Sequence, residues 1–375
     1  MAGANPTACV REAWPLWQEF GSHFIADDGR VLATQTGDRQ SFSEAQSYAM
    51  FFALVADDEV AFDKLWHWSV QNLAGGDIAN RLPAWLWGRS PEGNWQVLDL
   101  NSASDADLWF AYALLEAGRL WRRPDYTRDA RQLLANVERQ EVVDLPGLGK
   151  MLLPAPHGFT QPDAQWRLNP SYLPLPLLRR FAVESRLGPW SEMAINTANM
   201  MASVNANGLV ADWVAYRAPP GRQPGFIADP VSGQRGSYDA IRTYLWAGMT
   251  PDEDPLAAAM RKALAGMARL TTIDTSPPEL IDVGSGLASG TGPYGFSAAL
   301  LPYLRRAGAP AVAAQQAARA RAMQAASLLA KPPPSYYDHA LSLFGLGWFE
   351  NRYRFTSNGQ LQPKWQETCI PANSN

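Results

Sequence analysis

Helical segments that carry almost no charge constrain the fold of this chain most strongly. The segments 43–56, 104–121 and 236–249 are nearly free of charge beyond their first turn, and a helix that is apolar all round has to be buried on every side. The segments that follow the first two, 58–73 and 124–140, instead spread charged residues along one face, as surface helices do. This alternation predicts an inner ring of helices inside an outer ring.

A regular spacing supports the two rings. Glu44, Asp105, Tyr172 and Asp239 each lie at the opening of an expected inner helix, and these openings recur about every 60 to 70 residues, the length of two helices with their loops. We therefore expect the four residues to gather on one face of an all-α barrel. Further helices are expected at 10–21, 170–185, 188–204, 253–270, 295–307, 309–329 and 335–350.

Length and charge narrow the classes of protein to consider. A chain of 375 residues is long for one domain, but a large barrel accommodates that length, and since no linker is apparent we expect a single domain over residues 1–375. The net charge of −4 gives no basic surface for nucleic acid. No apolar run reaches the roughly 18 residues of a membrane helix. The first residues lack the pattern of an export signal, so we expect any such signal to have been removed.

Three acidic residues share one sequence context. Glu44 and Asp105 each follow a serine, and Asp239 lies in "RGSYDAIRTYLW". For each residue alone, helix capping is the simpler interpretation, and Ser43 with Gln46 has the spacing of a capping box. Three carboxylates on one barrel face would, however, repel one another unless a site required them. Paired carboxyl groups with separated pKa values are the groups that hydrolyse glycosidic bonds.

Aromatic residues accompany these carboxylates in the sequence. The chain contains 15 Trp, 12 Tyr and 14 Phe, and although most of the tryptophans are expected to fill the core, flat aromatic faces also bind sugar rings. The candidates for such faces are Trp85, Trp87, Trp109, Tyr172, Trp213, Tyr238 and Trp246.

Six segments together resemble glycoside hydrolase family eight, in order and over nearly the whole chain. They are "SEAQSYAMFFAL", "RLPAWLWG", "SASDADLWFAYALLEAGRLW", "LNPSYLP", "SYDAIRTYLW" and "GPYGFSAALLPYL". The chain is most similar to the members encoded with bacterial cellulose synthases. The resemblance implies an (α/α)6 barrel, with short strands or loops lining an open cleft, that hydrolyses β-1,4-glucans with inversion and without a metal or cofactor.

The resemblance also implies roles for single residues. Glu44 corresponds to the general acid, Asp239 to the general base, and Asp105 to a carboxylate that binds and distorts the sugar in the central subsite. Arg242 would orient a carboxylate or contact sugar, and Tyr172 would lie beside the attacking water. In an inverting site the acid and base carboxyl groups lie roughly 6.5–9.5 Å apart.

The proposed acid has to be protonated near neutral pH, although the N-terminus of a helix favours the charged form. Burial, or the like charge of Asp105, must therefore raise the pKa of Glu44. Asp107, two residues further along the same helix, is expected to cap it or to support the site from behind.

Several alternatives remain open at this stage. Chitosan, xylan and mixed-linkage glucan are also substrates within the family. A non-catalytic glucan-binding or scaffolding subunit of a polysaccharide export system is the alternative function, although the presence of all three carboxylates gives no sign that catalysis has been lost. Cys9 and Cys369 either form a disulfide in an oxidising compartment or are two thiols. From the resemblance we expect a periplasmic or secreted monomer, with the cellulose synthase export complex as a candidate partner.

Overall fold

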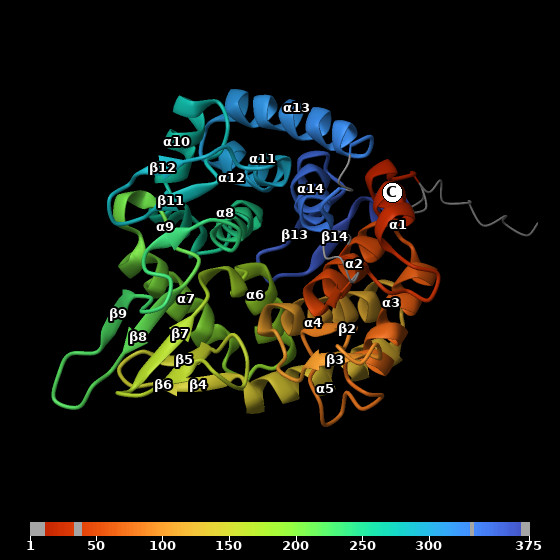
Figure 1. Ribbon diagram of the computed structural model, residues 1–375, viewed down its shortest axis with the longest axis horizontal. Coiled ribbons are helices and arrows are strands. Elements are labelled where there is room, and N and C mark those ends of the chain that lie inside the picture. The colour runs from red at the N-terminus through yellow and green to blue at the C-terminus, as the bar shows by residue number, and fades with distance from the viewer. Residues whose placement is uncertain (1–11, 34–39, 331–333, 369–375) are drawn as a thin grey trace, which may run out of the picture.

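Charge-poor helices form a closed inner ring in the computed structural model, which describes residues 12–33, 40–330 and 334–368 (Figure 1). Around the ring each helix contacts the next, and the last contacts the first. In order they are α2 (Ser43–Val55), α4 (Ser104–Leu120), α6 (Leu175–Glu184), α8 (Ala240–Met249), α11 (Tyr294–Ala299) with α12 (Leu301–Arg306), and α14 (Tyr336–Phe349).

A second set of helices covers the ring from outside, and the two rings together form an (α/α)6 barrel. The covering helices are α1 (Pro15–Phe24), α3 (Glu59–Asn72), α5 (Pro124–Gln140), α7 (Trp190–Val204), α9 (Ala257–Ala263), α10 (Gly266–Asp274) and α13 (Pro310–Ser327). The burial follows the sequence pattern. Nearly every residue of α2 and α4 is buried, whereas α5 buries one face only.

Two glycines allow inner helices to pack at very short distance. A Cβ at Gly345 of α14 would lie 1.8 Å from the carbonyl oxygen of Ala298 in α11, and a Cβ at Gly248 of α8 would lie 2.1 Å from the backbone nitrogen of Tyr303 in α12. Any side chain at these positions would push the helices apart. The closure of the ring therefore depends on glycine at both positions.

Short antiparallel strands lie in the connections between helices. β1 (Ser41–Phe42), β2 (Leu86–Arg89) and β3 (Trp95–Asp99) form one sheet, and β6 (Thr160–Gln161), β7 (Gln165–Leu168), β8 (Val214–Arg217) and β9 (Gly225–Ala228) form another. β10 (Arg235–Gly236), β11 (Leu280–Asp282) and β12 (Ala288–Ser289) form a third. Because β1 leads directly into α2 and β10 leads towards α8, these strands lie near the barrel end where the inner helices begin.

Two small hairpins and several short helices complete the described chain. The hairpins are β4 (Val142–Leu145) with β5 (Gly149–Leu152), and β13 (Tyr353–Phe355) with β14 (Leu361–Pro363). The short helices are the 3-10 turns η1 (Pro170–Tyr172) and η2 (Ala206–Gly208), and α15 (Lys364–Thr368). Within the described ranges, no helix has the length and apolar character needed to cross a membrane.

The structure corrects some of the expected helices. The expected helix 170–185 is divided into η1 and α6 at Leu173 and Pro174, since proline lacks the N–H of a helix interior. The expected helix 253–270 is divided into α9 and α10. The capping box is also wrong, because Ser43 is already helical and the Gln46 amide turns inward to the carbonyl of Gly29.

Candidate active site

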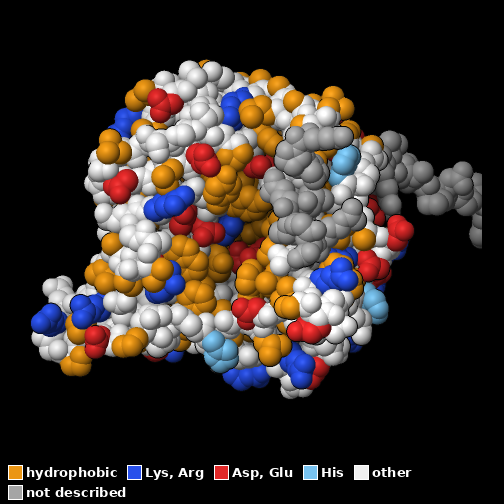
Figure 2. All heavy atoms as spheres, viewed as in Figure 1, with side chains coloured by type: hydrophobic (Ala, Val, Ile, Leu, Met, Phe, Trp, Pro, Cys, Tyr) orange, Lys and Arg blue, Asp and Glu red, His pale blue; other side chains and the backbone are white. Residues whose placement is uncertain are grey.

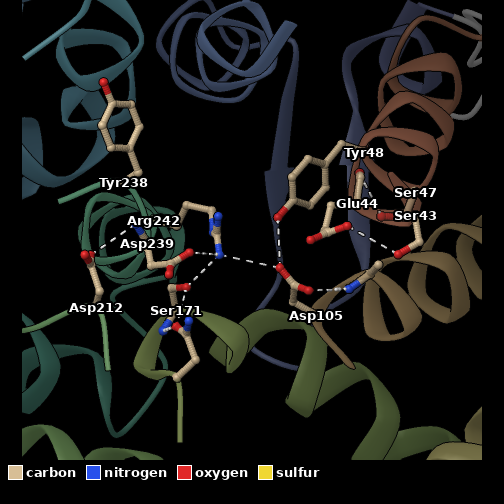
Figure 3. A network of polar contacts seen from close by, with 12 residues as sticks. Ser43, Glu44, Ser47, Tyr48, Asp105, Ser171, Asp212, Tyr238, Asp239 and Arg242 are labelled. Atoms are coloured by element: carbon tan, nitrogen blue, oxygen red, sulfur yellow. Dashed lines mark hydrogen bonds and ion pairs between the residues drawn. The ribbon is translucent and has the colours of Figure 1, made fainter. Parts of the chain in front are cut away.

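The beginnings of α2, α4 and α8 bring Glu44, Asp105 and Asp239 to one end of the barrel (Figure 3). Glu44 and Asp105 lie in the first turns of α2 and α4, and Asp239 directly precedes α8. On the face shown in Figure 2, acidic and basic side chains lie in and beside a central hollow that is bordered by hydrophobic side chains. Carboxyl groups that are far apart in the sequence thus share one site.

Arg242, in the first turn of α8, lies between the carboxylates of Asp105 and Asp239. Its Nη2 atom lies 2.9 Å from Oδ1 of Asp239 and 3.5 Å from Oδ2 of Asp105. The same nitrogen donates a hydrogen bond of 2.9 Å to Ser171 Oγ, and Nη1 donates one of 3.0 Å to the hydroxyl of Tyr337. The guanidinium group is therefore held from three elements besides its own helix, and it faces both carboxylates.

Asp105 is the most enclosed of the three acids, with 2% of its surface exposed. Its Oδ1 atom accepts a hydrogen bond of 2.9 Å from the backbone N–H of Ala106, and its Oδ2 atom accepts one of 3.4 Å from the hydroxyl of Tyr48. Burial raises the pKa of Asp105 to about 6, although the charge of Arg242 opposes the shift. At neutral pH the group is therefore mainly ionised.

Glu44 has the electrostatic environment of a proton donor. Burial raises the pKa of Glu44 to about 8, and the charge of Asp105 adds to the shift. The hydroxyl of Ser43, 3.3 Å from Oε2 of Glu44, opposes the shift by donating to the carboxylate. Burial and a like charge thus outweigh the hydrogen bonds and the helix N-terminus that stabilise the charged form.

Asp107 faces away from these groups, into the protein behind the site. Its side chain is fully buried and caps no helix N–H, so the expected cap is absent. Instead it lies against the carboxyl group of Glu141, whose charge acts on it, and Glu141 accepts a 2.6 Å hydrogen bond from Ser102. Burial raises the pKa of Glu141 to about 8, and it raises the pKa of Asp107 well above its ordinary range.

The aromatic candidates divide into exposed and buried residues. Trp85, Trp87, Tyr172 and Trp213 are partly exposed, and Tyr238 is 45% exposed. Trp213 stacks on Phe159 with ring centroids 5.7 Å apart, and Trp87 stacks on Trp95 at 5.1 Å. Trp87 and Trp95 lie on β2 and β3, whereas Phe159 and Trp213 lie next to β6 and β8.

Trp109 and Trp246 are not available to a substrate, and the role expected for them is wrong. Trp109 is 0% exposed and Trp246 is also buried, and the ring of Trp109 packs against those of Phe51, Trp246 and Phe344 in the centre of the barrel. Trp109 lies in the second turn of α4, and other helices surround α4 at that level. A side chain there fills the core even though the first turn of the same helix carries a site residue.

Sequence reasoning missed the residues that hold the site together. Tyr48, Ser171 and Tyr337 contact Asp105 or Arg242, but none of them was singled out for this contact. Ser171 and Tyr337 open helical segments, as the three acids do, and this shared position was the available signal. Cys9 and Cys369 lie outside the described residues, and the described residues contain no cluster of His, Cys, Asp or Glu that could hold a metal ion.

Comparisons with known proteins agree with this arrangement. The family model described as "Glycosyl hydrolases family 8" matches residues 5–351. An endoglucanase of Pseudomonas fluorescens (strain SBW25) is 48% identical over 367 residues, which are 95% of this chain and 92% of the relative. An endoglucanase of Escherichia coli (strain K12) is 44% identical over 364 residues, which are 96% of this chain and 93% of the relative.

Solved structures are similar over almost the same length. The endo-1,4-D-glucanase from Vibrio fischeri ES114 superimposes with a TM-score of 0.89 and 38% identity, covering 94% of this chain and all of that chain. The endo-β-1,4-glucanase CMCax from Acetobacter xylinum has a TM-score of 0.70 and 25% identity, covering 88% of this chain and 96% of the other.

Proposed function

Because this chain belongs to glycosyl hydrolase family 8 and is an inverting endo-β-1,4-glucanase, we propose that Glu44 is its general acid and Asp239 its general base. The observation that carries this proposal is the position of Arg242, which contacts Asp239 and Asp105 at once, while the charge of Asp105 acts on Glu44. Two carboxyl groups in different electrostatic environments meet the requirement of acid and base catalysis.

Glu44 would donate its proton to the glycosidic oxygen as the bond to the leaving sugar breaks. A pKa of about 8 keeps this carboxyl group protonated at neutral pH, so the proton is present when substrate binds. Once donated, it leaves a carboxylate that takes up a proton from solvent after the product has left.

Asp239 would take a proton from the water that attacks the anomeric carbon on the opposite face of the sugar. The ion pair with Arg242, 2.9 Å long, orients its carboxylate. Attack from the face opposite to the leaving group inverts the configuration at the anomeric carbon. Tyr172, whose ring centroid lies 5.8 Å from the Arg242 guanidinium carbon, would lie beside this water.

Asp105 would bind the sugar at the point of cleavage. Its enclosed carboxylate accepts hydroxyl hydrogen bonds, and its charge helps to keep Glu44 protonated. The exposed aromatic residues Trp85, Trp87, Trp213 and Tyr238 would receive further glucose units of a β-1,4-glucan chain on their flat faces.

We extend the proposal to the cellular setting. The similarity to members encoded with cellulose synthases favours cellulose as the substrate, a periplasmic or secreted location and a monomeric single-domain enzyme that acts beside a cellulose export complex. No feature of the site favours the glucan-binding subunit, because all three carboxyl groups are in place.

The test is proton NMR of the anomeric signals during incubation with cellohexaose. We expect α-anomeric reducing ends on shorter oligomers to appear first, and Glu44→Gln and Asp239→Asn to fold normally but lose most of this activity. Early β-anomers, or near wild-type turnover in both variants, would refute the acid and base assignment. An unchanged spectrum with cello-, xylo- and chito-oligomers would favour the binding subunit.

A further inference from the structure

Asp212 holds the backbone of the proposed base from outside its helix. Its Oδ1 atom accepts hydrogen bonds from three backbone N–H groups, those of Ser237 at 2.7 Å, Asp239 at 3.1 Å and Ala240 at 2.7 Å. Figure 3 shows Asp212 beside Asp239. These groups open α8, where N–H groups have no partner within the helix. One carboxylate oxygen therefore fixes the turn on which Asp239 is carried.

The helix has no cap of its own. Asp239 is the N-cap residue of α8 but makes no side-chain cap hydrogen bond, although an aspartate there commonly accepts from the first free N–H groups. Its carboxylate is instead paired with Arg242 at 2.9 Å. The N–H groups that an N-cap side chain would bind, those of Ile241 and Arg242, donate instead to the carbonyls of Ser237 and Asp239, so the carboxylate of Asp239 is not needed as a cap.

The segment that carries Asp212 is fastened to α8 at a second point. The backbone N–H of Val210 donates a 3.2 Å hydrogen bond to the hydroxyl of Tyr244, one turn further along α8, and the N–H of Asp212 donates a 2.8 Å bond to the carbonyl of Arg235. A Cβ at Gly236 would lie 2.4 Å from the carbonyl oxygen of Val210. This close approach requires glycine and leaves the segment little freedom.

The next residue along the chain belongs to an aromatic surface. The ring of Trp213 lies nearly parallel to that of Phe159, at an angle of 3°, and its centroid is 6.3 Å from that of Tyr172. The guanidinium group of Arg167 covers Trp213 at 4.9 Å. Residues 212 and 213 thus join the backbone of the base to a cluster of aromatic side chains beside the site.

We propose that Asp212 is a positioning residue whose hydrogen bonds to the first turn of α8 aim the carboxylate of Asp239 at the attacking water. It acts through backbone geometry and touches no reacting atom. The inference rests on the proposed role of Asp239 as general base.

The direct test compares three substitutions of Asp212. Asp212→Ala removes all three hydrogen bonds, and we expect kcat on cellohexaose to fall about 10- to 100-fold, as for a small misplacement of a catalytic group, with a smaller change in KM. Asp212→Asn retains an oxygen that accepts the same hydrogens and should restore most of kcat. If the alanine variant does not fold, Asp212→Glu shifts the acceptor by one carbon atom and should lower kcat in a folded protein.

A substrate with an activated leaving group identifies which catalytic step is impaired. A 2,4-dinitrophenyl β-cellotrioside needs no proton from the acid, so Glu44→Gln should recover much of its activity on it. Asp212→Ala should remain impaired, as Asp239→Asn does, because the water still requires its base. Recovery of Asp212→Ala on this substrate, or wild-type kcat of that variant on cellohexaose, would overturn the proposal.

Tyr244→Phe is the matched control. It loosens the same segment at its other attachment point but leaves the hydrogen bonds at the base intact, so kcat should stay near the wild-type value. An equal fall of kcat in Tyr244→Phe and Asp212→Ala would show that general loosening is responsible and would overturn the proposal. If Asp239→Asn is fully active, the base assignment itself fails and the inference with it. If Asp239→Asn is inactive while Asp212→Ala is normal, only the inference fails.

Discussion

Replacing Glu141 by glutamine should make the stability of the protein less dependent on pH. The side chain is fully buried beside the carboxyl group of Asp107 and accepts a hydrogen bond from Ser102. Glutamine has almost the same shape and offers an oxygen to Ser102, but it does not ionise. The substitution thus removes one titrating group and keeps the hydrogen bond from Ser102.

The expected size of the effect follows from the shift in pKa. Burial raises the pKa of Glu141 from 4.5 to about 8, so the unfolded chain loses this proton at lower pH than the folded protein does. The stability that the protonated group contributes therefore falls as the pH rises from about 4.5 to about 8. At about 1.4 kcal/mol for each pKa unit, Glu141 alone should remove about 4 kcal/mol from the free energy of unfolding between pH 5 and pH 9.

The assay is urea unfolding of both proteins at pH 5, 7 and 9, followed by tryptophan fluorescence. The difference in unfolding free energy, Glu141→Gln minus wild type, should grow by about 4 kcal/mol from pH 5 to pH 9. Glu253→Gln, which removes a carboxyl group at an exposed position, is measured in parallel as the control. A constant difference for Glu141→Gln would show that Glu141 is already ionised in the folded protein at pH 5, and would refute the reasoning.

Two further outcomes follow from the site and the barrel. The value of kcat/KM on cello-oligosaccharides should fall as pH rises past about 8, because Glu44 then loses its proton, and a 13C NMR titration of the Glu44 carboxyl should show its pKa lowered in Asp105→Asn. An unchanged titration would mean that burial alone sets this pKa. Gly345→Ala should lower the free energy of unfolding by about 1–3 kcal/mol, as overpacking does, because the added Cβ meets the carbonyl oxygen of Ala298. A variant whose midpoint of thermal unfolding equals that of the wild type would contradict this.

Helix positions were largely predictable because burial leaves a periodic record in the sequence. The charge-free stretches became α2, α4 and α8 of the inner ring, and the charged stretches after the first two became α3 and α5 of the outer ring. Glu44, Asp105 and Asp239 were identifiable because each opens such a helix. Trp109 was misjudged, since the same record does not distinguish an aromatic residue that lines a cleft from one that fills the core.

The two rings, and the end of the barrel at which the acids meet, could be predicted from the sequence because apolar periodicity and helix starts are properties of neighbouring residues. The surroundings of each acid arise only when the chain folds. Arg242 is bound by Ser171 and Tyr337, which are 71 and 95 residues away from it along the chain. Asp212 likewise binds three N–H groups at the start of α8, which lie 25 to 28 residues further along the chain. The pKa of a carboxyl group depends on burial and on charges that approach through space, and no local pattern records either.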